Sequence, residues 1–241
     1  VLVVDNASPN ESAFILNNEA EKEGFVFIAN KNNNGYAAGN NVGIKYAVDN
    51  GYEYTWILNN DIEITDKNIL LKMVNVFQKN LDVACVGQKI FDLNGNICSP
   101  YINRPNLWTM TLGLLFEKKN RARYDDVSGI VYRLHGCSML LKNADMQAVN
   151  YMDERTFLYC EEEILAERLL EIGKKSFYTA DTSLIHKESS TVGHHRGFGC
   201  LNKIKIVSQS MHLYLKEYRK YNCMQLFLCV FFRSILIFVK G

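Results

Sequence analysis

The chain has 241 residues, of which 48% are hydrophobic and 22% charged, enough for one substantial α/β domain with its own core. Its 3 prolines and 15 glycines argue against long disordered linkers, and its net charge of +1 gives no electrostatic footprint for nucleic acid, so we expect no nucleic-acid partner. The 7 cysteines form no Cys-x-x-Cys pair, which argues against a zinc site or a disulfide framework and favours reduced thiols inside a cell.

The first part of the chain alternates between short apolar runs and helical patterns. We expect strands at 1–4, 25–28, 54–58 and 83–87, and helices at 11–22, 37–49 and 69–79. This alternation predicts an α/β domain with a mostly parallel sheet. Ligands of such sheets bind beyond the carboxyl ends of the strands, where the polar segments 5–10 and 59–61 are placed.

The second part is less regular between 92 and 133, and a basic run occupies 118–123. We expect a strand within 131–141 and a helix over 161–172, whose first residues are acidic and suit the helix dipole. The segment 223–239 is strongly apolar but contains Arg233. A short membrane-embedded stretch, an interfacial helix and a buried terminal helix are all compatible with it.

Two polar segments offer groups for a nucleotide and a cation. Asp61 follows the strand at 54–58. A carboxylate at this position can bind a hard divalent cation, which can neutralise a leaving diphosphate. Asn and Asp after a strand are also typical of a helix cap, which is the alternative. The glycine-rich segment 34–43 opens a helix and offers backbone N–H groups to an anion, or is simply a turn that packs closely on the sheet. It is not a P-loop, because it lacks the Gly-Lys-Ser/Thr ending.

Acidic residues at the start of the helix at 161–172 are candidates for acid–base chemistry. Transfer to a hydroxyl group needs a base that takes its proton, and a carboxylate beside aromatic side chains would suit a sugar. The alternative is that these acids only cap the helix. His186 follows an expected strand and can ligate a metal through a neutral nitrogen, although a lone histidine is more often structural, and His194 and His195 are more typical of surface residues.

The order of the motifs is more informative than any one of them. In chain order they are Val3-Val4-Asp5-Asn6-Ala7-Ser8, Asn33-Asn34-Gly35-Tyr36-Ala37-Ala38-Gly39-Asn40-Asn41, Leu58-Asn59-Asn60-Asp61, Gly136-Cys137-Ser138-Met139-Leu140, Asp153-Glu154 with Phe157-Leu158-Tyr159 and Glu161-Glu162, and His186 with Ser189. This order resembles the family 2 inverting glycosyltransferases of the GT-A fold, and most closely their bacterial rhamnosyltransferase-like branch. The resemblance extends to about residue 221, so we expect a catalytic domain at 1–221 and a separate apolar segment at 222–241.

The resemblance implies a role for each matching residue. Asp5 corresponds to an aspartate that contacts the base or ribose of the donor. The other residues implied on the donor side are Asn6, Asn34, Gly35, Asn40, Asn59 and Asn60. Those implied on the acceptor side are Gly136, Cys137 and Tyr159. Asp61 and His186 are the implied ligands of Mg²⁺ or Mn²⁺. Glu162 is the implied catalytic base, with Glu161 as its rival, since the usual Glu-Asp-x-Asp-Leu pattern reads Glu161-Glu162-Glu163-Ile164-Leu165 here.

The resemblance also implies an activity and a location. It implies inverting transfer of a sugar from dTDP-rhamnose or a UDP-sugar to a saccharide or lipid-linked acceptor, in the synthesis of cell-surface polysaccharide at the cytoplasmic face of the membrane. The first strand and helix of the family are absent, so we expect the chain to be truncated at its N-terminus. A sugar-phosphate nucleotidyltransferase and a non-catalytic nucleotide-sugar-binding module are the alternatives.

Overall fold

The computed structural model describes residues 1–115, 126–187 and 200–240. The basic run at 118–123, Ser189, His194 and His195 therefore lie outside the described residues.

The first part of the chain folds as its pattern predicts. Its elements are β1 (Leu2–Asp5), α1 (Ser12–Glu23), β2 (Val26–Ala29), α2 (Tyr36–Asp49), β3 (Tyr54–Leu58), β4 (Ile62–Glu63), α3 (Ile69–Lys79) and β5 (Val83–Phe91). Gly24 ends α1 with a left-handed φ of 70° and donates its N–H to the carbonyl of Ala20. The predicted boundaries lie within one residue of those observed, except that β5 continues to Phe91 and that the short β4 was not expected.

The second part contains more elements than its sequence pattern predicts. They are α4 (Leu107–Met110), η1 (Leu112–Leu115), β6 (Gly129–Val131), β7 (Ser138–Lys142), α5 (Asn143–Ala148), α6 (Glu161–Glu171), β8 (Lys175–His186), α7 (Leu201–Leu213), the π-helical segment η5 (Tyr214–Tyr218) and α8 (Cys223–Lys240). The single strand expected within 131–141 is in fact the end of β6, an intervening turn and most of β7.

The α/β class is confirmed, and the sheet is mixed, with antiparallel strands that the sequence pattern did not indicate. The order of the main sheet is β3-β7-β5-β8-β4, with β6 also paired to β8. β5 and β8 are parallel neighbours, and β3 runs in the same direction because β3 and β5 are both antiparallel to β7. β1 and β2 form a separate parallel pair. The difference arises because the chain returns after β5 and inserts β7 between β3 and β5 in the antiparallel direction.

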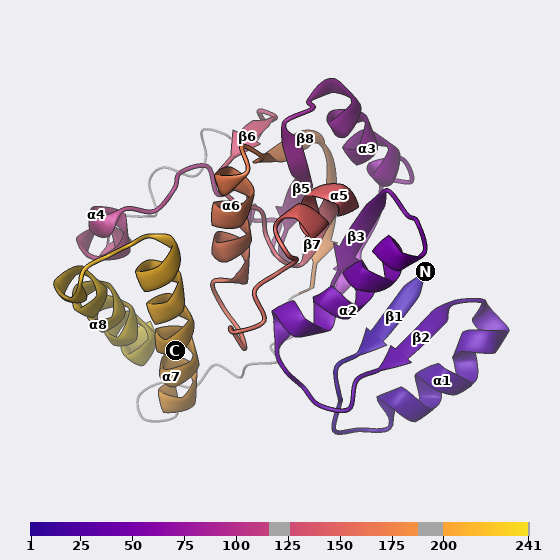
Figure 1. Cartoon of the computed structure of the whole chain (residues 1–241), viewed down its shortest axis with the longest axis horizontal. Helices are drawn as coiled ribbons and strands as arrows, with labels where there is room; N and C mark the ends of the chain where they lie inside the picture. The colour runs from indigo at the N-terminus through magenta and orange to yellow at the C-terminus, as the bar shows by residue number, and fades with distance from the viewer. Residues whose placement is uncertain (116–125, 188–199, 241) are drawn as a thin grey trace.

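Helices cover both faces of this sheet (Figure 1). On one face, α2, α5 and α6 contribute Ile44, Met146 and Leu165 to a core that includes Met139 and Leu141 of β7. On the other face, α3 packs against a second core that includes Leu140 of β7. The alternation of these three β7 residues between the two cores follows from the period of two in a strand.

The C-terminal helices form a third cluster beside α6. Leu226, Cys229 and Ile237 of α8 are buried there against α7 and η5, whereas Phe227 and Phe231 of α8 are exposed. None of the helices within the described ranges combines the length and the apolarity needed to cross a bilayer.

This topology brings distant segments to one edge of the sheet. Asp5 ends β1, Asn59 follows β3, and His186 ends β8. Because β7 is antiparallel to β3, its starting end lies at the same edge, and Leu58 is paired with Ser138. The turn that contains Gly136 and Cys137 therefore meets the segment 59–61.

Candidate active site

Asn6, directly after β1, organises the loop that precedes α2. Its Nδ2 donates to Oδ1 of Asn33 and to the carbonyl of Gly35, both at 3.0 Å, and its Oδ1 accepts from Nδ2 of Asn30 at 3.1 Å. Gly39 packs against the same amide, since a Cβ at Gly39 would lie 3.1 Å from the Asn6 nitrogen. Asn6 therefore fixes the start of α2 relative to β1.

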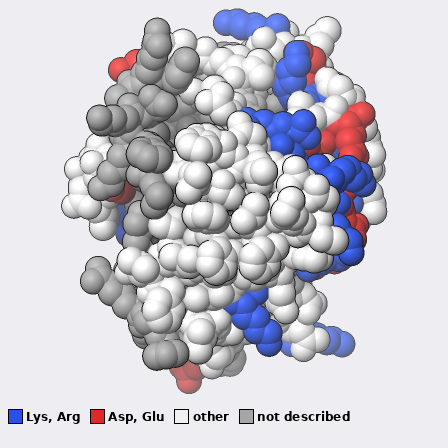
Figure 2. All heavy atoms as spheres, turned by 90° about the vertical axis from the view of Figure 1, so that its left-hand side faces the viewer, with Lys and Arg blue, Asp and Glu red and all other residues white. Residues whose placement is uncertain are grey.

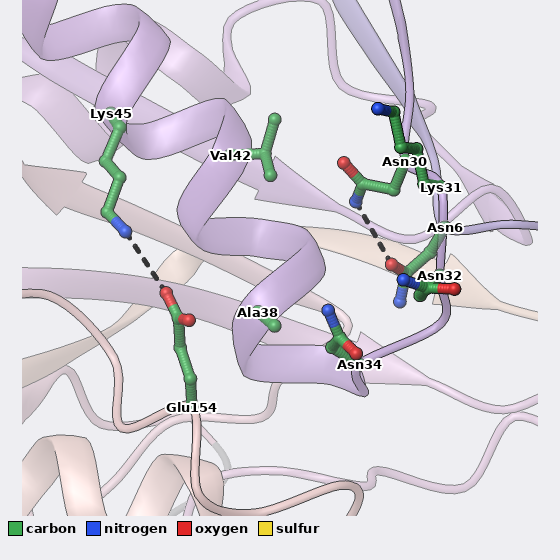
Figure 3. Close-up of a pocket in the computed structure, with 9 residues that line it drawn as sticks. All are labelled: Asn6, Asn30, Lys31, Asn32, Asn34, Ala38, Val42, Lys45 and Glu154. Atoms are coloured by element: carbon green, nitrogen blue, oxygen red, sulfur yellow. Dashed lines mark hydrogen bonds and ion pairs between the residues drawn. The ribbon is translucent and has the colours of Figure 1, made fainter.

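A polar cavity of about 250 Å³ opens beside this loop (Figure 3). Figure 3 shows Asn6 and the loop side chains on one side of α2, and the ion pair between Lys45 and Glu154, 3.1 Å long, on the other. The cavity is lined by Asn6, Asn30, Lys31, Asn32, Asn34, Ala38, Val42, Lys45 and Glu154. Carbonyl, amide and ammonium groups together suit a polar ligand such as a nucleoside.

The other expected donor residues differ in their contacts. The carboxylate of Asp5 is buried and accepts from the backbone N–H of Ser8 at 3.0 Å, so it holds its own turn. Asn40 donates to the carbonyl of Tyr36 at 2.9 Å, within α2. Asn34 and Asn60 are exposed, and Asn34 lines the cavity.

Asn41 is a site-supporting residue that our sequence analysis missed. Its side chain is buried, donates to the carbonyl of Met152 at 2.9 Å and accepts from the N–H of Met152 at 3.0 Å. It also donates to Oε1 of Glu154 at 2.8 Å. Asn41 thus ties α2 to the loop that leads to α6, and its place within the glycine-rich motif was the available signal.

Gly35 is required where this loop touches the acid motif. Its φ is 97°, and a Cβ at this position would lie only 2.2 Å from the carbonyl oxygen of Phe157. The same oxygen accepts the N–H of Tyr36 at 2.9 Å. The start of α2 therefore lies directly against the segment that precedes Glu161.

Asp61 and His186, which the resemblance implies as metal ligands, meet at the edge of the sheet. Nε2 of His186 lies 3.2 Å from Oδ1 of Asp61, and Ile62 pairs with His186 between β4 and β8. Asn59 lies beside them and donates its N–H to the carbonyl of Cys137 at 2.9 Å.

These two side chains fit a divalent cation. The nitrogen that faces Asp61 is Nε2, whereas Nδ1, the other ring nitrogen of His186, is buried and has no hydrogen-bond partner within the described part of the chain. Ligands in neighbouring positions around an ion with bonds of about 2.0–2.2 Å lie roughly 3 Å apart, and the spacing of Asp61 and His186 is of this size. A carboxylate and an imidazole suit Mn²⁺ well, and Mg²⁺ through the oxygen.

The three consecutive glutamates at the start of α6 have three different environments. Glu161 is buried, and Oε1 of its carboxyl group has no hydrogen-bond partner among the described residues. Burial, followed by the neighbouring charge of Glu162, raises the pKa of Glu161 to about 8. Glu163 pairs with Arg133 at 2.9 Å, and Arg133 in turn stacks on the ring of Tyr101.

Of the three glutamates, Glu162 is the one whose side chain contacts the turn before β7. Its Oε1 accepts the N–H of Gly136 at 3.0 Å. A Cβ on Gly136 would lie 2.5 Å from this oxygen and 3.0 Å from the hydroxyl of Tyr36, so only glycine allows the approach. Tyr36 donates to the carbonyl of Gly136, and burial, followed by the charge of Glu162, raises the pKa of Tyr36.

The residues just before α6 have a strained backbone. Tyr159 and Cys160 have φ values of 77° and 66°, in the left-handed region that non-glycine residues rarely adopt. Such strain is often found at functional sites. Tyr159 is half-buried and packs against the C-terminal helices, which places this expected acceptor residue between α6 and the third cluster.

Part of the acid motif holds the fold together instead. Asp153 is buried and accepts from Arg155 and, at 2.6 Å, from the hydroxyl of Tyr218. Although burial opposes it, these hydrogen bonds lower the pKa of Asp153 to about 2.

His135, which our sequence analysis also missed, lies beside Cys137 and His186. Its His-x-Cys spacing to Cys137 was the available signal.

Comparisons with known proteins bear on the family and the fold. The chain is 25% identical over 165 residues to the low-salt glycan biosynthesis hexosyltransferase Agl10 of Haloferax volcanii; the match covers 67% of the chain and 50% of that relative. The chain thus spans about half the length of this curated relative.

Two solved structures resemble the fold. The mannosyltransferase PcManGT of Pyrobaculum calidifontis, in complex with GDP-Man and Mn²⁺, has a TM-score of 0.60 and 14% identity, covering 98% of this chain and 60% of its own. S. aureus TarS 1–349, in complex with UDP-GlcNAc, has a TM-score of 0.54 and 14% identity, covering 99% of this chain and 64% of its own. These likenesses confirm the α/β fold of GT-A type.

The model of the family described as glycosyl transferase family 2 matches residues 1–147, which is more than half of the chain and includes Asp5, the glycine-rich loop, Asp61 and the Gly136–Cys137 turn. Asp5 ends β1, and Asp61, which follows β3, meets His186 at the edge of the main sheet. The chain belongs to glycosyl transferase family 2.

Proposed function

We propose that the chain transfers a hexose from a nucleoside-diphosphate sugar to a hydroxyl acceptor, with inversion and with Glu162 as the base. The observation that supports this most directly is the placement of Glu162. Its carboxylate is bound to the turn at 136–137, and the same turn is bound to Asn59, two residues before Asp61. A base and a potential cation site therefore share one short backbone segment.

Glu162 suits the role of base better than Glu161. A base at neutral pH must be ionised and within reach of the acceptor, whereas Glu161 is buried and its pKa is raised to about 8. Glu162 is partly exposed. We assign Glu161 the role of a neutral neighbour, which spares Glu162 the repulsion of a second charge.

The reaction follows from these positions. An acceptor hydroxyl beside Glu162 loses its proton to that carboxylate while its oxygen attacks the anomeric carbon of the donor. The bond from that carbon to the diphosphate breaks on the opposite face, and the diphosphate leaves with the bonding electrons, so the configuration inverts. Asp61 and His186 would hold a divalent cation, and when bound it neutralises charge on the leaving diphosphate.

The donor site extends from Asn6 to the start of α2. The amides of Asn34 and Asn59 and the turn of Asp5 supply hydrogen bonds for a base, ribose or sugar, and Asn6 holds the loop that carries Asn34 in place. dTDP-rhamnose and UDP-sugars are the donors to test first. PcManGT and TarS, each solved with a nucleotide sugar, support this class of donor. Gly136, Cys137 and Tyr159 would then line the acceptor side. Membership of a glycosyltransferase family does not favour the nucleotidyltransferase alternative.

We also propose that α8 places the enzyme on the cytoplasmic face of a membrane, where polysaccharide precursors are lipid-linked. Figure 2 shows a broad uncharged area on this side of the molecule, with lysines and arginines at its edge. The exposed apolar side chains of α8 are Met224, Phe227, Phe231, Ile235, Phe238 and Val239. Exposed Lys216 and Lys220 precede the helix, and such basic residues are attracted to anionic lipids.

The activity is tested by release of nucleoside diphosphate from a panel of dTDP-, UDP- and GDP-sugars, with Mn²⁺, Mg²⁺ or EDTA. We expect turnover of one donor that EDTA abolishes. Glu162→Gln should lower kcat by about 100- to 10,000-fold without weakening donor binding measured by calorimetry. Glu171→Gln, at the exposed end of the same helix, is the matched control.

Two results would contradict the proposal. Donor binding without turnover under every condition would favour the non-catalytic binding module. No binding of any nucleotide sugar would exclude both the transferase and the binding module.

The membrane proposal has its own test. The double variant Phe227→Glu with Phe231→Glu should no longer sediment with anionic vesicles, and its donor hydrolysis should be unchanged. Equal sedimentation of the variant and the wild type would contradict the membrane proposal.

A further inference from the structure

A second group of potential metal ligands adjoins the Asp61–His186 pair. One ligand atom each from His135, Cys137 and His186 lies within 4.8 Å of the others. Cys137 and His186 are buried, His135 is partly exposed, and the rings of the two histidines meet edge to face with their centroids 5.6 Å apart. A small movement of these side chains would bring all three to bonding distance of one ion.

The backbone around this group holds it in place. The N–H of Cys137 donates to Nδ1 of His135 at 3.3 Å, and its carbonyl accepts from Asn59 at 2.9 Å. His186 is fixed from the other side, because Ile62 pairs with it across β4 and β8. The group thus lies between two strand ends and a turn, and not on a loop tip.

The chemistry of the three side chains differs from that of a Mg²⁺ site. Mg²⁺ prefers hard oxygen ligands, whereas thiolate and imidazole prefer Zn²⁺ and similar thiophilic cations. The buried Nδ1 of His186, which has no hydrogen-bond partner within the described residues, is an independent sign of a missing ligand here. Asp61, 3.2 Å from the same imidazole, can supply an oxygen to an ion on that side.

We propose that His135, Cys137 and His186 form a thiophilic cation site that binds Zn²⁺ and shares His186 with the metal site of the proposed function, on which this inference rests. Binding releases the Cys137 thiol proton to solvent and forms bonds from the cation to one sulfur and two nitrogens. A neutral imidazole ligates a metal through one nitrogen and carries a proton on the other, so His186 serves only one of the two sites at a time, and bound Zn²⁺ excludes the cation needed for transfer. Zn²⁺ therefore inhibits an enzyme that Mg²⁺ or Mn²⁺ activates.

The test uses the full chain without an affinity tag and without any donor. Co²⁺ is added as a spectroscopic substitute for Zn²⁺, and Zn²⁺ affinity is measured by calorimetry in excess Mg²⁺. We expect a thiolate-to-cobalt charge-transfer band in wild type. Cys137→Ser should remove this band and weaken Zn²⁺ binding by at least about 10- to 100-fold. Cys223→Ser, which changes an exposed thiol, should leave both unchanged.

His135→Ala is the second variant, at a partly exposed position, and should weaken Zn²⁺ binding even if Cys137→Ser does not fold. A wild-type Co²⁺ spectrum without the charge-transfer band, or equal Zn²⁺ affinity in wild type and both variants, overturns the proposal. Since these measurements need no donor, such a result leaves the transferase proposal intact. Absence of turnover in a chain that binds Zn²⁺ in the expected way would overturn the proposed function alone.

Discussion

At the scale of single residues, two glycines allow the parts of the site to approach each other. Gly136 admits the carboxylate of Glu162, and Gly35 admits the carbonyl of Phe157. Both contacts join segments more than twenty residues apart, so the tertiary structure requires glycine at each position, and at Gly35 the left-handed φ of 97° requires it as well. A side chain at either position would push the donor loop or the base away from the turn at 136–137.

Gly35→Ala should destabilise the fold strongly, because the new methyl group meets a backbone oxygen at 2.2 Å and the φ of 97° is strained for alanine. The strain alone costs about 1–3 kcal/mol, and the collision adds to it. Gly24→Ala is the matched control, since Gly24 also has a positive φ but nothing lies within 4 Å of its added Cβ. Its cost should be only about 1–2 kcal/mol in urea unfolding. Equal losses in the two variants would contradict the close approach at Phe157.

The buried carboxyl group of Glu161 should make stability depend on pH. Its pKa rises from 4.5 to about 8 on folding, so the native state holds a proton that the unfolded chain releases. Its contribution is therefore complete below pH about 4.5 and is lost as the pH rises through about 8. Glu161→Gln, which stays neutral, should gain stability relative to wild type across this range, measured by urea unfolding at several pH values. A constant difference between the two proteins would contradict the raised pKa.

At the scale of elements, one buried carboxylate joins α6 to the C-terminal region. Glu167 of α6 accepts from Nε of Arg104 at 2.9 Å and from the hydroxyl of Tyr132 at 2.7 Å. The Tyr132 hydroxyl lies 2.7 Å from that of Tyr214 in η5, to which Arg219 donates at 2.8 Å. The helix that carries Glu162 is thus also held in place through Glu167, by residues that precede β7 and by the C-terminal region.

Removal of this carboxylate should be costly. Glu167→Ala removes the carboxylate beside Arg219, which is largely buried, and leaves the Tyr132 hydroxyl with Tyr214 as its remaining partner, and we expect a loss of about 3 kcal/mol or more in the free energy of unfolding. Glu171→Ala, on an exposed position of the same helix, should change stability by less than about 0.5 kcal/mol. Similar values for both variants would show that the network contributes nothing to stability.

Helices and strands could be predicted where the sequence pattern of the segment itself determines them. The helix at 69–79 has an apolar face of period 3.6, and its observed bounds are those expected. The insertion of β7 between β3 and β5 was not predictable, because pairing depends on contacts between residues far apart in sequence. The same reason explains the pairing of Glu163 with Arg133, since nothing near either residue indicates which glutamate faces an arginine.

At the scale of the whole molecule, the order of motifs indicated which segments form the candidate site, but not which residue has which role. The family resemblance implied that Asp61 and His186 share one metal ion, and the two side chains do lie 3.2 Å apart, while their role as ligands stays a prediction. It did not distinguish Glu161 from Glu162, since their difference lies in burial and in the contact with Gly136. It also missed His135, whose partner His186 is brought to it only by the sheet.

The unit formed by β1, α1 and β2 should be the least stable part of the fold. β1 and β2 pair with each other, no other described strand joins their ladder, and α1 has no buried residue. By contrast, β5 lies between β7 and β8 and is almost entirely buried. Local opening requires less free energy where few apolar contacts are lost.

Hydrogen–deuterium exchange measured by mass spectrometry should therefore show faster exchange in peptides covering residues 2–29 than in those covering β5. Asn6 links the unit to the start of α2 through Gly35, and α2 contacts β3 of the main sheet. Asn6→Ala should accelerate exchange in residues 2–29 further and leave the exchange of β5 unchanged. Equal protection of the two regions in wild type, or equal acceleration in both in the variant, would mean that the protein opens as a single cooperative unit.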